Sequence, residues 1–103
     1  MVRADRVVRG EILHVNQGHT LSLQFHEQKD ETSYLLRGRL RLTRGPTLDS
    51  LSSEEIDPGG CWRNTPGLIH TIEALSDADV LEVSTPELND VVRLKDVYGR
   101  QGT

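Results

Sequence analysis

The sequence has little cysteine, few aromatic residues and no long apolar run. Cys61 is the only cysteine, which excludes an internal disulfide and a cysteine-based zinc cluster and fits a reducing compartment. No apolar run approaches the ~20 residues that span a membrane. The first 15 residues lack the apolar core of a signal peptide. We therefore expect a cytoplasmic protein with no membrane partner.

An excess of positive charge is also missing. Lys and Arg number 12 against 16 Asp and Glu, so the formal net charge is -4 at pH 7. A chain with this net field repels the phosphates of nucleic acid, and we expect no nucleic-acid partner. At 103 residues and 35% hydrophobic content there is room for one core, with a small margin of stability. The prediction is one domain over residues 1–103.

Short segments with strand patterns, separated by turns rich in glycine and proline, fill most of the sequence. The segments are residues 7–13 (bent or bulged at Gly10), 20–26, 33–42, 48–56, 61–63, 68–73, 78–84 and 91–94. No convincing amphipathic helix is present, although residues 87–98 could hold one turn near their start. Many short strands with such punctuation indicate an all-β sandwich or barrel.

Residues 33–42 read as a hairpin about Arg37 and Gly38. In its second strand the leucines at 40 and 42 face inward, and Arg39 and Arg41 face outward. This arginine pair is either a phosphate clamp or a solvated face that keeps the strand soluble, and strand periodicity alone favours the solvated face.

Polar residues occupy one whole face of the alternating segment 20–26, and Gln24 and His26 are among them. In a two-layer sheet that face would meet solvent, whereas in a small closed barrel it can line a polar pocket. Glu31 follows a charged bend that could return it to the same place. From spacing alone, a metal site, a polar pocket and a surface face all remain open. His14 and His19 have no liganding partner nearby in the sequence, and we expect a surface position or ordinary hydrogen bonding for them.

Two spacings resemble the conserved motifs of the cupin superfamily. The first motif is matched by Gly18, five residues, Gln24-Phe25-His26, four residues, Glu31, six residues and Gly38. The second is matched by Gly59, five residues, Thr65-Pro66-Gly67, two residues and His70. The resemblance implies a small cupin barrel (a double-stranded β-helix or jelly roll) of two antiparallel sheets. It also implies that four side chains bind a metal: Gln24, His26, Glu31 and His70.

Gln24 restricts the resemblance to a smaller group within the superfamily, because most cupins have histidine at that position. The run Leu21-Ser22-Leu23-Gln24 and residues 90–100 are similar to the cupin domain of type II mannose-6-phosphate isomerases. This likeness implies one divalent metal ion and an isomerase acting on a sugar or sugar phosphate. Mixed nitrogen and oxygen ligands suit zinc, which we expect first, or iron, manganese, cobalt or nickel.

Three functions stay open: a metal-dependent isomerase or epimerase of a sugar or sugar phosphate, a non-haem iron-dependent oxygenase of a small molecule, and a non-catalytic module that binds a small ligand. All place a small molecule in the barrel mouth. An isomerase also needs a base, and Glu82 and Arg63 are candidates if they face the lumen. Cys61 is expected to be a semi-buried thiol, and Trp62 either packs in the core or stacks on a ligand. A core this thin makes a homodimer reasonable.

Overall fold

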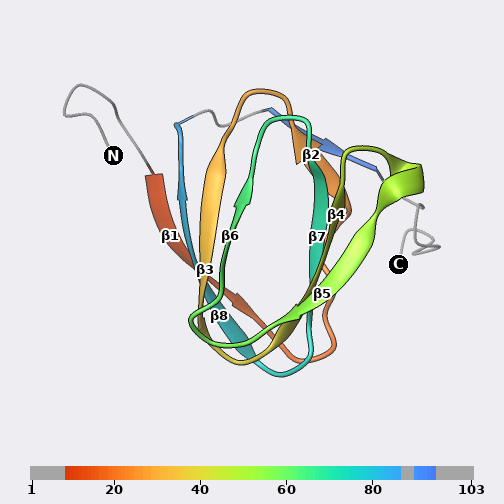
Figure 1. The fold of residues 1–103 in the computed structure, drawn as a ribbon. Helices are drawn as coiled ribbons and strands as arrows, with labels where there is room; N and C mark the ends of the chain where they lie inside the picture. Colours follow the sequence, from red (N-terminus) through yellow and green to blue (C-terminus); the bar gives the residue numbers. More distant parts are fainter. Residues whose placement is uncertain (1–8, 87–89, 95–103) are drawn as a thin grey trace.

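The computed structural model describes residues 9–86 and 90–94, and its strands form two antiparallel sheets that face each other (Figure 1). The four-stranded sheet has the order β1 (Arg9–Val15), β8 (Ala78–Ser84), β3 (Glu31–Arg37), β6 (Cys61–Asn64). The five-stranded sheet has the order β5 (Ser52–Ile56), β4 (Leu40–Gly45), β7 (Ile69–Ala74), β2 (Gln24–His26), β9 (Val91–Arg93). The expected all-β barrel of two antiparallel sheets is confirmed.

The hydrophobic core lies between the sheets and follows the period-two pattern of the strands. Leu40 and Leu42 of β4 are fully buried, as the alternation predicts, and they belong to the same buried cluster as Leu35 of β3 and Val80 of β8. Each such side chain stabilises the fold by roughly 2 kcal/mol relative to an exposed one. Trp62 is buried in this cluster as well. The apolar core fills one part of the barrel and leaves the other to polar side chains.

The predicted hairpin over residues 33–42 is wrong, because β3 and β4 belong to opposite sheets. The chain passes between the sheets at Gly38, whose φ of 87° lies in the left-handed region that favours glycine. A Cβ atom at Gly38 would also clash with the backbone oxygen of Asp77. The glycine is therefore required by a crossing between sheets, where the sequence pattern had suggested a tight turn within one sheet.

Other expected strands differ in length. In residues 20–26 only β2 is a strand, and Thr20 makes a single bridge to Glu73. The bulge expected at Gly10 is not there, since β1 pairs with β8 in unbroken register from Arg9 to Val15. Residues 48–50 form a 3-10 turn before β5. The helical turn expected near the start of residues 87–98 lies outside the described residues.

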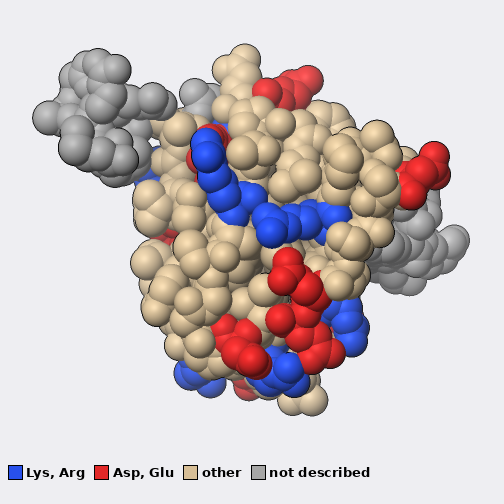
Figure 2. All heavy atoms as spheres, viewed as in Figure 1, with Lys and Arg blue, Asp and Glu red and all other residues tan. Residues whose placement is uncertain are grey.

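Charged side chains of both signs lie together on one face of the molecule. Figure 2 shows basic and acidic side chains side by side on the face that carries β5 and β6. The Arg39 guanidinium lies 2.6 Å from a Glu55 carboxylate oxygen, and that of Arg41 lies 2.6 Å from one of Glu73. These pairs favour the interpretation of Arg39 and Arg41 as a solvated face. Among the described residues, no helix is long and apolar enough to cross a membrane.

Candidate metal centre

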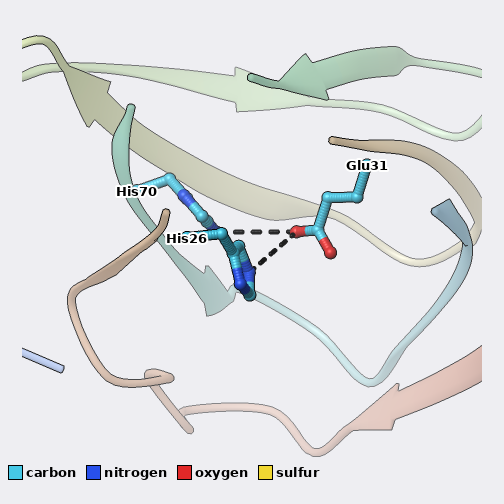
Figure 3. Close-up of side chains that lie close together, drawn as sticks. All are labelled: His26, Glu31 and His70. Carbon is cyan, nitrogen blue, oxygen red and sulfur yellow. Dashed lines mark ion pairs between the residues drawn. The ribbon is translucent and has the colours of Figure 1, made fainter. Parts of the chain in front are cut away.

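Three polar side chains meet between the sheets although each is at least nine-tenths buried. His26 ends β2 and His70 lies on the neighbouring β7, while Glu31 begins β3 of the facing sheet. Their ligand atoms all lie within 4.8 Å of one another. Figure 3 shows both imidazole rings directed at the Glu31 carboxylate. The group is of the kind that holds a divalent metal ion.

Hydrogen bonds on the far side of each ring fix its orientation. The His70 Nδ1 atom lies 3.0 Å from the backbone oxygen of Leu68. Because a carbonyl oxygen only accepts hydrogen bonds, Nδ1 carries the hydrogen and Nε2 presents its lone pair to the site. The His26 Nδ1 atom lies in the same way 3.1 Å from an oxygen of Asp90. Partners of this type orient histidines that ligate metals.

Glu31 faces those Nε2 atoms. Its Oε1 atom lies 3.5 Å from Nε2 of His70 and 4.0 Å from Nε2 of His26. A carboxylate oxygen opposite a nitrogen lone pair needs a proton or a metal cation between them. Burial alone raises the pKa of Glu31. When the histidines are protonated, hydrogen bonds from His70 and Asn64 and the histidine charges outweigh burial, and the pKa falls below its usual range. The carboxyl group is therefore ionised and ready to bind a cation.

Asp90 also supports this site, a role that the sequence did not indicate. Its carboxylate accepts hydrogen bonds from the backbone N–H groups of Gln28 and Lys29, at 2.7 and 2.6 Å, besides holding His26. Burial raises the pKa of Asp90, but these backbone hydrogen bonds and His26 more than compensate, and the pKa is lowered. The aspartate thus ties the bend after β2 to the histidine.

Gln24, the fourth expected ligand, lies on the same strand as His26, β2, and is the Cα partner of His70 on β7. Its Oε1 atom accepts a hydrogen bond of 2.8 Å from the Ser22 hydroxyl. The amide oxygen keeps a second lone pair for a metal. The structure therefore places Gln24 beside the two histidines, and ligation by it stays a prediction.

A cavity of about 370 Å³ opens in front of the three side chains. Its wall holds all four expected ligands, the carboxyl groups of Glu11 and Glu82, the cations Lys29 and Arg93, and apolar side chains that include Trp62. A larger hollow of about 780 Å³ lies on the opposite side of the five-stranded sheet, next to the Arg41–Glu73 pair. We place the candidate site in the smaller cavity, because the buried histidines and Glu31 line it.

The two candidate bases lie in different places. Glu82 lines the cavity, and burial raises the pKa of its carboxyl from 4.5 to about 7, with a further contribution from the charges of Glu31 and Glu11. Arg63 does not meet the condition of facing the lumen, because its exposed guanidinium pairs with Asp30 outside the cavity, at 2.5 and 3.0 Å. Glu82 is the one of the two that can reach a ligand in the cavity.

The structure also shows where Cys61, Trp62 and the two remaining histidines lie. Cys61 is exposed, so the expected semi-buried thiol is wrong; it alternates along β6 with Trp62, which takes the inward position. Trp62 packs in the core, as one of its two expected roles requires, and it also lines the cavity. Stacking on a ligand stays a prediction. His14 and His19 are exposed, as expected, and His14 pairs with Asp79 on the outside of the barrel.

Comparison with known proteins shows the class of fold. No family model matches the chain, and no curated protein does. Oxalate decarboxylase from Bacillus subtilis superposes on 93% of this chain with a TM-score of 0.77 and 22% identity. QdtA, a sugar 3,4-ketoisomerase from Thermoanaerobacterium thermosaccharolyticum in complex with TDP, covers 87% of it with a TM-score of 0.73 and 17% identity. An oxalate oxidase in complex with the substrate analogue glycolate covers 92% with a TM-score of 0.75 and 18% identity.

These similarities establish that the chain has the cupin fold. The chain spans 26% of the length of the decarboxylase, 50% of the oxidase and 69% of the ketoisomerase. Within that fold, its particular feature is a buried His-Glu-His group with a glutamine on the same wall.

Proposed function

We propose that this chain is a metal-dependent isomerase or epimerase that acts on a sugar or sugar phosphate bound in the cavity. The position of Glu82 carries the proposal. This largely buried carboxyl group lies in the wall that holds the His-Glu-His group, on the sheet opposite the two histidines. An isomerase needs a base for proton transfer between adjacent carbons, beside a group that polarises an oxygen atom.

The residues of the site fit a divalent metal. His26, Glu31 and His70 would hold it, with Gln24 as a fourth ligand, and the acceptors behind both rings already fix the histidines for this task. The bound ion would act as a Lewis acid on a carbonyl or hydroxyl oxygen of the ligand. Zinc is the ion that we expect first, and the mixed nitrogen and oxygen ligands also suit iron, manganese, cobalt or nickel.

Glu82 would move the proton. Its pKa of about 7 means that both protonation states are populated near neutral pH, so the group can take a proton from one carbon and return it to the next. The hydroxyl proton passes from one oxygen to the other by exchange with solvent. Lys29 and Arg93 line the same cavity and supply positive charge for a phosphate group of the ligand. The shared fold of a sugar ketoisomerase that binds TDP supports this class of ligand.

The set of two histidines and one carboxylate favours a second candidate, a non-haem iron-dependent oxygenase of a small molecule. Oxalate oxidase has the same fold, which supports this alternative to the same extent as QdtA supports the first. An oxygenase makes no use of Glu82 as a base, and for this reason we prefer the isomerase. A non-catalytic binding module is the outcome if neither reaction occurs.

The test is hydrogen exchange at the reacting carbon. The protein is loaded in turn with zinc, manganese, iron, cobalt or nickel and incubated in ²H₂O with mannose 6-phosphate or fructose 6-phosphate. We expect deuterium at the carbon next to the carbonyl, detected by NMR. Glu82→Gln should slow its incorporation by about 100-fold or more, the usual contribution of a general base.

Glu54→Gln is the matched control, because Glu54 is an exposed glutamate on β5 outside the cavity. Equal exchange in Glu82→Gln and the wild type would contradict the role of Glu82. Oxygen consumption by the iron-loaded protein without exchange would favour the oxygenase. Metal binding with neither reaction would leave the binding module.

A further inference from the structure

Two buried polar atoms in the cavity wall have no hydrogen-bond partner among the described residues: the Ser33 hydroxyl and the Oδ1 atom of Asn64. Ser33 is 1% exposed and Asn64 is 3% exposed. A buried polar atom that stays unpaired destabilises a fold by about 1–3 kcal/mol. Since both residues line the cavity, a molecule that enters the cavity can provide the missing partner.

The pairing of the strands places these two atoms beside the proposed chemistry. Ser33 lies on β3 and is the Cα partner of Glu82 on one side and Trp62 on the other. Asn64 lies on β6 and is the Cα partner of Glu31. All of these side chains line the cavity from the four-stranded sheet. Ser33 is thus next to the candidate base Glu82, and Asn64 is next to the candidate metal ligand Glu31.

The chemistry of Asn64 fixes what its partner must be. Its Nδ2 atom donates to Oε1 of Glu31 at 3.3 Å. A carboxylate can only accept, so the amide cannot be flipped, and Oδ1 is the atom left unpaired. Oδ1 accepts and never donates. The Ser33 hydroxyl can do either, and the neighbouring Glu82 accepts when ionised. This wall therefore requires hydrogen-bond donors from the ligand.

We infer that Ser33 and Asn64 form a recognition subsite for a hydroxyl group of the ligand, which selects polyhydroxylated molecules over dicarboxylates. The inference deepens the proposed function and rests on it for the location of the reacting centre. A sugar hydroxyl donates to Asn64 and can accept from Ser33. A dicarboxylate ionised at neutral pH has no donor for Asn64.

In the free protein both atoms are buried without a partner in the part of the chain that the structure describes. A ligand that provides their hydrogen bonds gains affinity, and one that cannot provide them leaves the atoms unpaired. Binding sites that hydrogen-bond a substrate hydroxyl discriminate strongly against analogues without it, because the protein group is then left buried and unpaired. The two unpaired atoms are therefore a source of specificity and not only of binding strength.

The test compares two classes of probe and two substitutions. Mannose 6-phosphate and fructose 6-phosphate represent the hydroxyl-bearing class, and oxalate and malonate represent the acceptor-only class. Binding is measured by calorimetry, with and without zinc. We expect Ser33→Ala to weaken binding of the sugar phosphates about tenfold. The same substitution should leave the thermal midpoint of the free protein unchanged or raised, because it removes an unpaired buried hydroxyl.

Ser53→Ala is the matched control, since Ser53 lies on the outer side of the five-stranded sheet and pairs with Thr43. Asn64→Leu is a second variant of similar size. It also removes the hydrogen bond to Glu31, so its zinc content is measured separately. We expect it to weaken the sugar phosphates at least as much as Ser33→Ala does.

Three results would overturn the inference: wild-type affinity for the sugar phosphates in both variants, oxalate bound by the wild type as tightly as the sugar phosphates, or no binding by either class with or without zinc. The proposed reaction can fail alone. In that case Ser33→Ala weakens sugar-phosphate binding as expected, while no metal supports deuterium exchange.

Discussion

Each histidine of the candidate centre has one ring nitrogen committed to an acceptor and the other left for a ligand. For His26 the acceptor is a carboxylate, which holds the ring and raises the basicity of the ligating nitrogen. For His70 it is a backbone oxygen, which no substitution of a side chain can remove. Asp90 is therefore the supporting residue through which the strength of the site can be tested without touching a ligand.

Asp90→Asn is expected to weaken zinc binding about 10- to 100-fold, the usual effect of losing such a partner. The asparagine keeps an oxygen near His26 Nδ1 but removes the negative charge. The measurement is the dissociation constant for Zn²⁺ against a competing chelator. Asp49→Asn, an exposed aspartate in the 3-10 turn, is the control. Zinc affinity that is equal in Asp90→Asn and the wild type would show that Asp90 does not support the site.

Glu82 gives the metal-free protein a characteristic dependence of stability on pH. Its folded pKa of about 7 lies above the ordinary value of 4.5, so the folded state binds a proton that the unfolded state has released between these pH values. The free energy of unfolding therefore falls as the pH rises through this window. The full loss, on the order of 3 kcal/mol, is present above the folded pKa.

Glu82→Gln should remove this contribution, because the amide carries no charge to bury. We expect urea unfolding with a chelator present to show a smaller decrease in stability from pH 5 to pH 8 in the variant than in the wild type. Glu54→Gln, which alters an exposed carboxylate, should follow the wild type. If the profiles of Glu82→Gln and the wild type run parallel, the buried carboxyl does not titrate in this range.

At the scale of the strands, periodicity predicts which face is buried, and long-range pairing decides the rest. The alternation of residues 40–42 places Leu40 and Leu42 inward correctly, because burial of a strand face is a local pattern. The same residues were predicted to pair with 33–36. Gly38 indicates only that the chain turns. In the structure β3 pairs with β6 and β8, and β4 pairs with β5 and β7. A short stretch of sequence does not show with which strand a given strand pairs.

Part of the candidate centre could likewise be predicted from the sequence, and part of it could not. The resemblance to the two cupin motifs implied that His26, Glu31 and His70 converge, and they do so. Asp90 and Asn64, which hold His26 and Glu31 in place, were missed. They reach the site through the pairing of β9 with β2 and of β6 with β3, and their residue types are common at turns and strand ends. A motif can identify the ligands. The residues that hold the ligands in place depend on how the strands pair in the sheets.

At the scale of the molecule, the outer face of the four-stranded sheet is unusually apolar. Its exposed side chains include Ile12 on β1, Tyr34 and Leu36 on β3 and Val83 on β8, which are 40–58% exposed. Ile12 and Tyr34 lie in one row across the sheet, both paired with Leu81. We name these four exposed residues the apolar face.

Charged groups at both ends of the apolar face are already paired within the chain. His14 and Arg37 bind Asp79 at one end, and Arg63 binds Asp30 at the other. Two copies can therefore bring this face together without unpaired charges at its centre and with ion pairs left at the rim. Identical patches pair in this way about a two-fold axis. We expect the homodimer predicted from the sequence to form here.

Ile12→Glu should convert that homodimer to monomer, because it places a charge at the centre of the apolar contact, where it would be buried without a partner. The measurement is molar mass by sedimentation equilibrium over a range of protein concentrations. Leu48→Glu is the control, since Leu48 is 46% exposed but lies in the 3-10 turn away from this sheet. A wild type that stays monomeric, or a dimer that survives Ile12→Glu and dissociates in Leu48→Glu, would show that the apolar face does not bind a second copy.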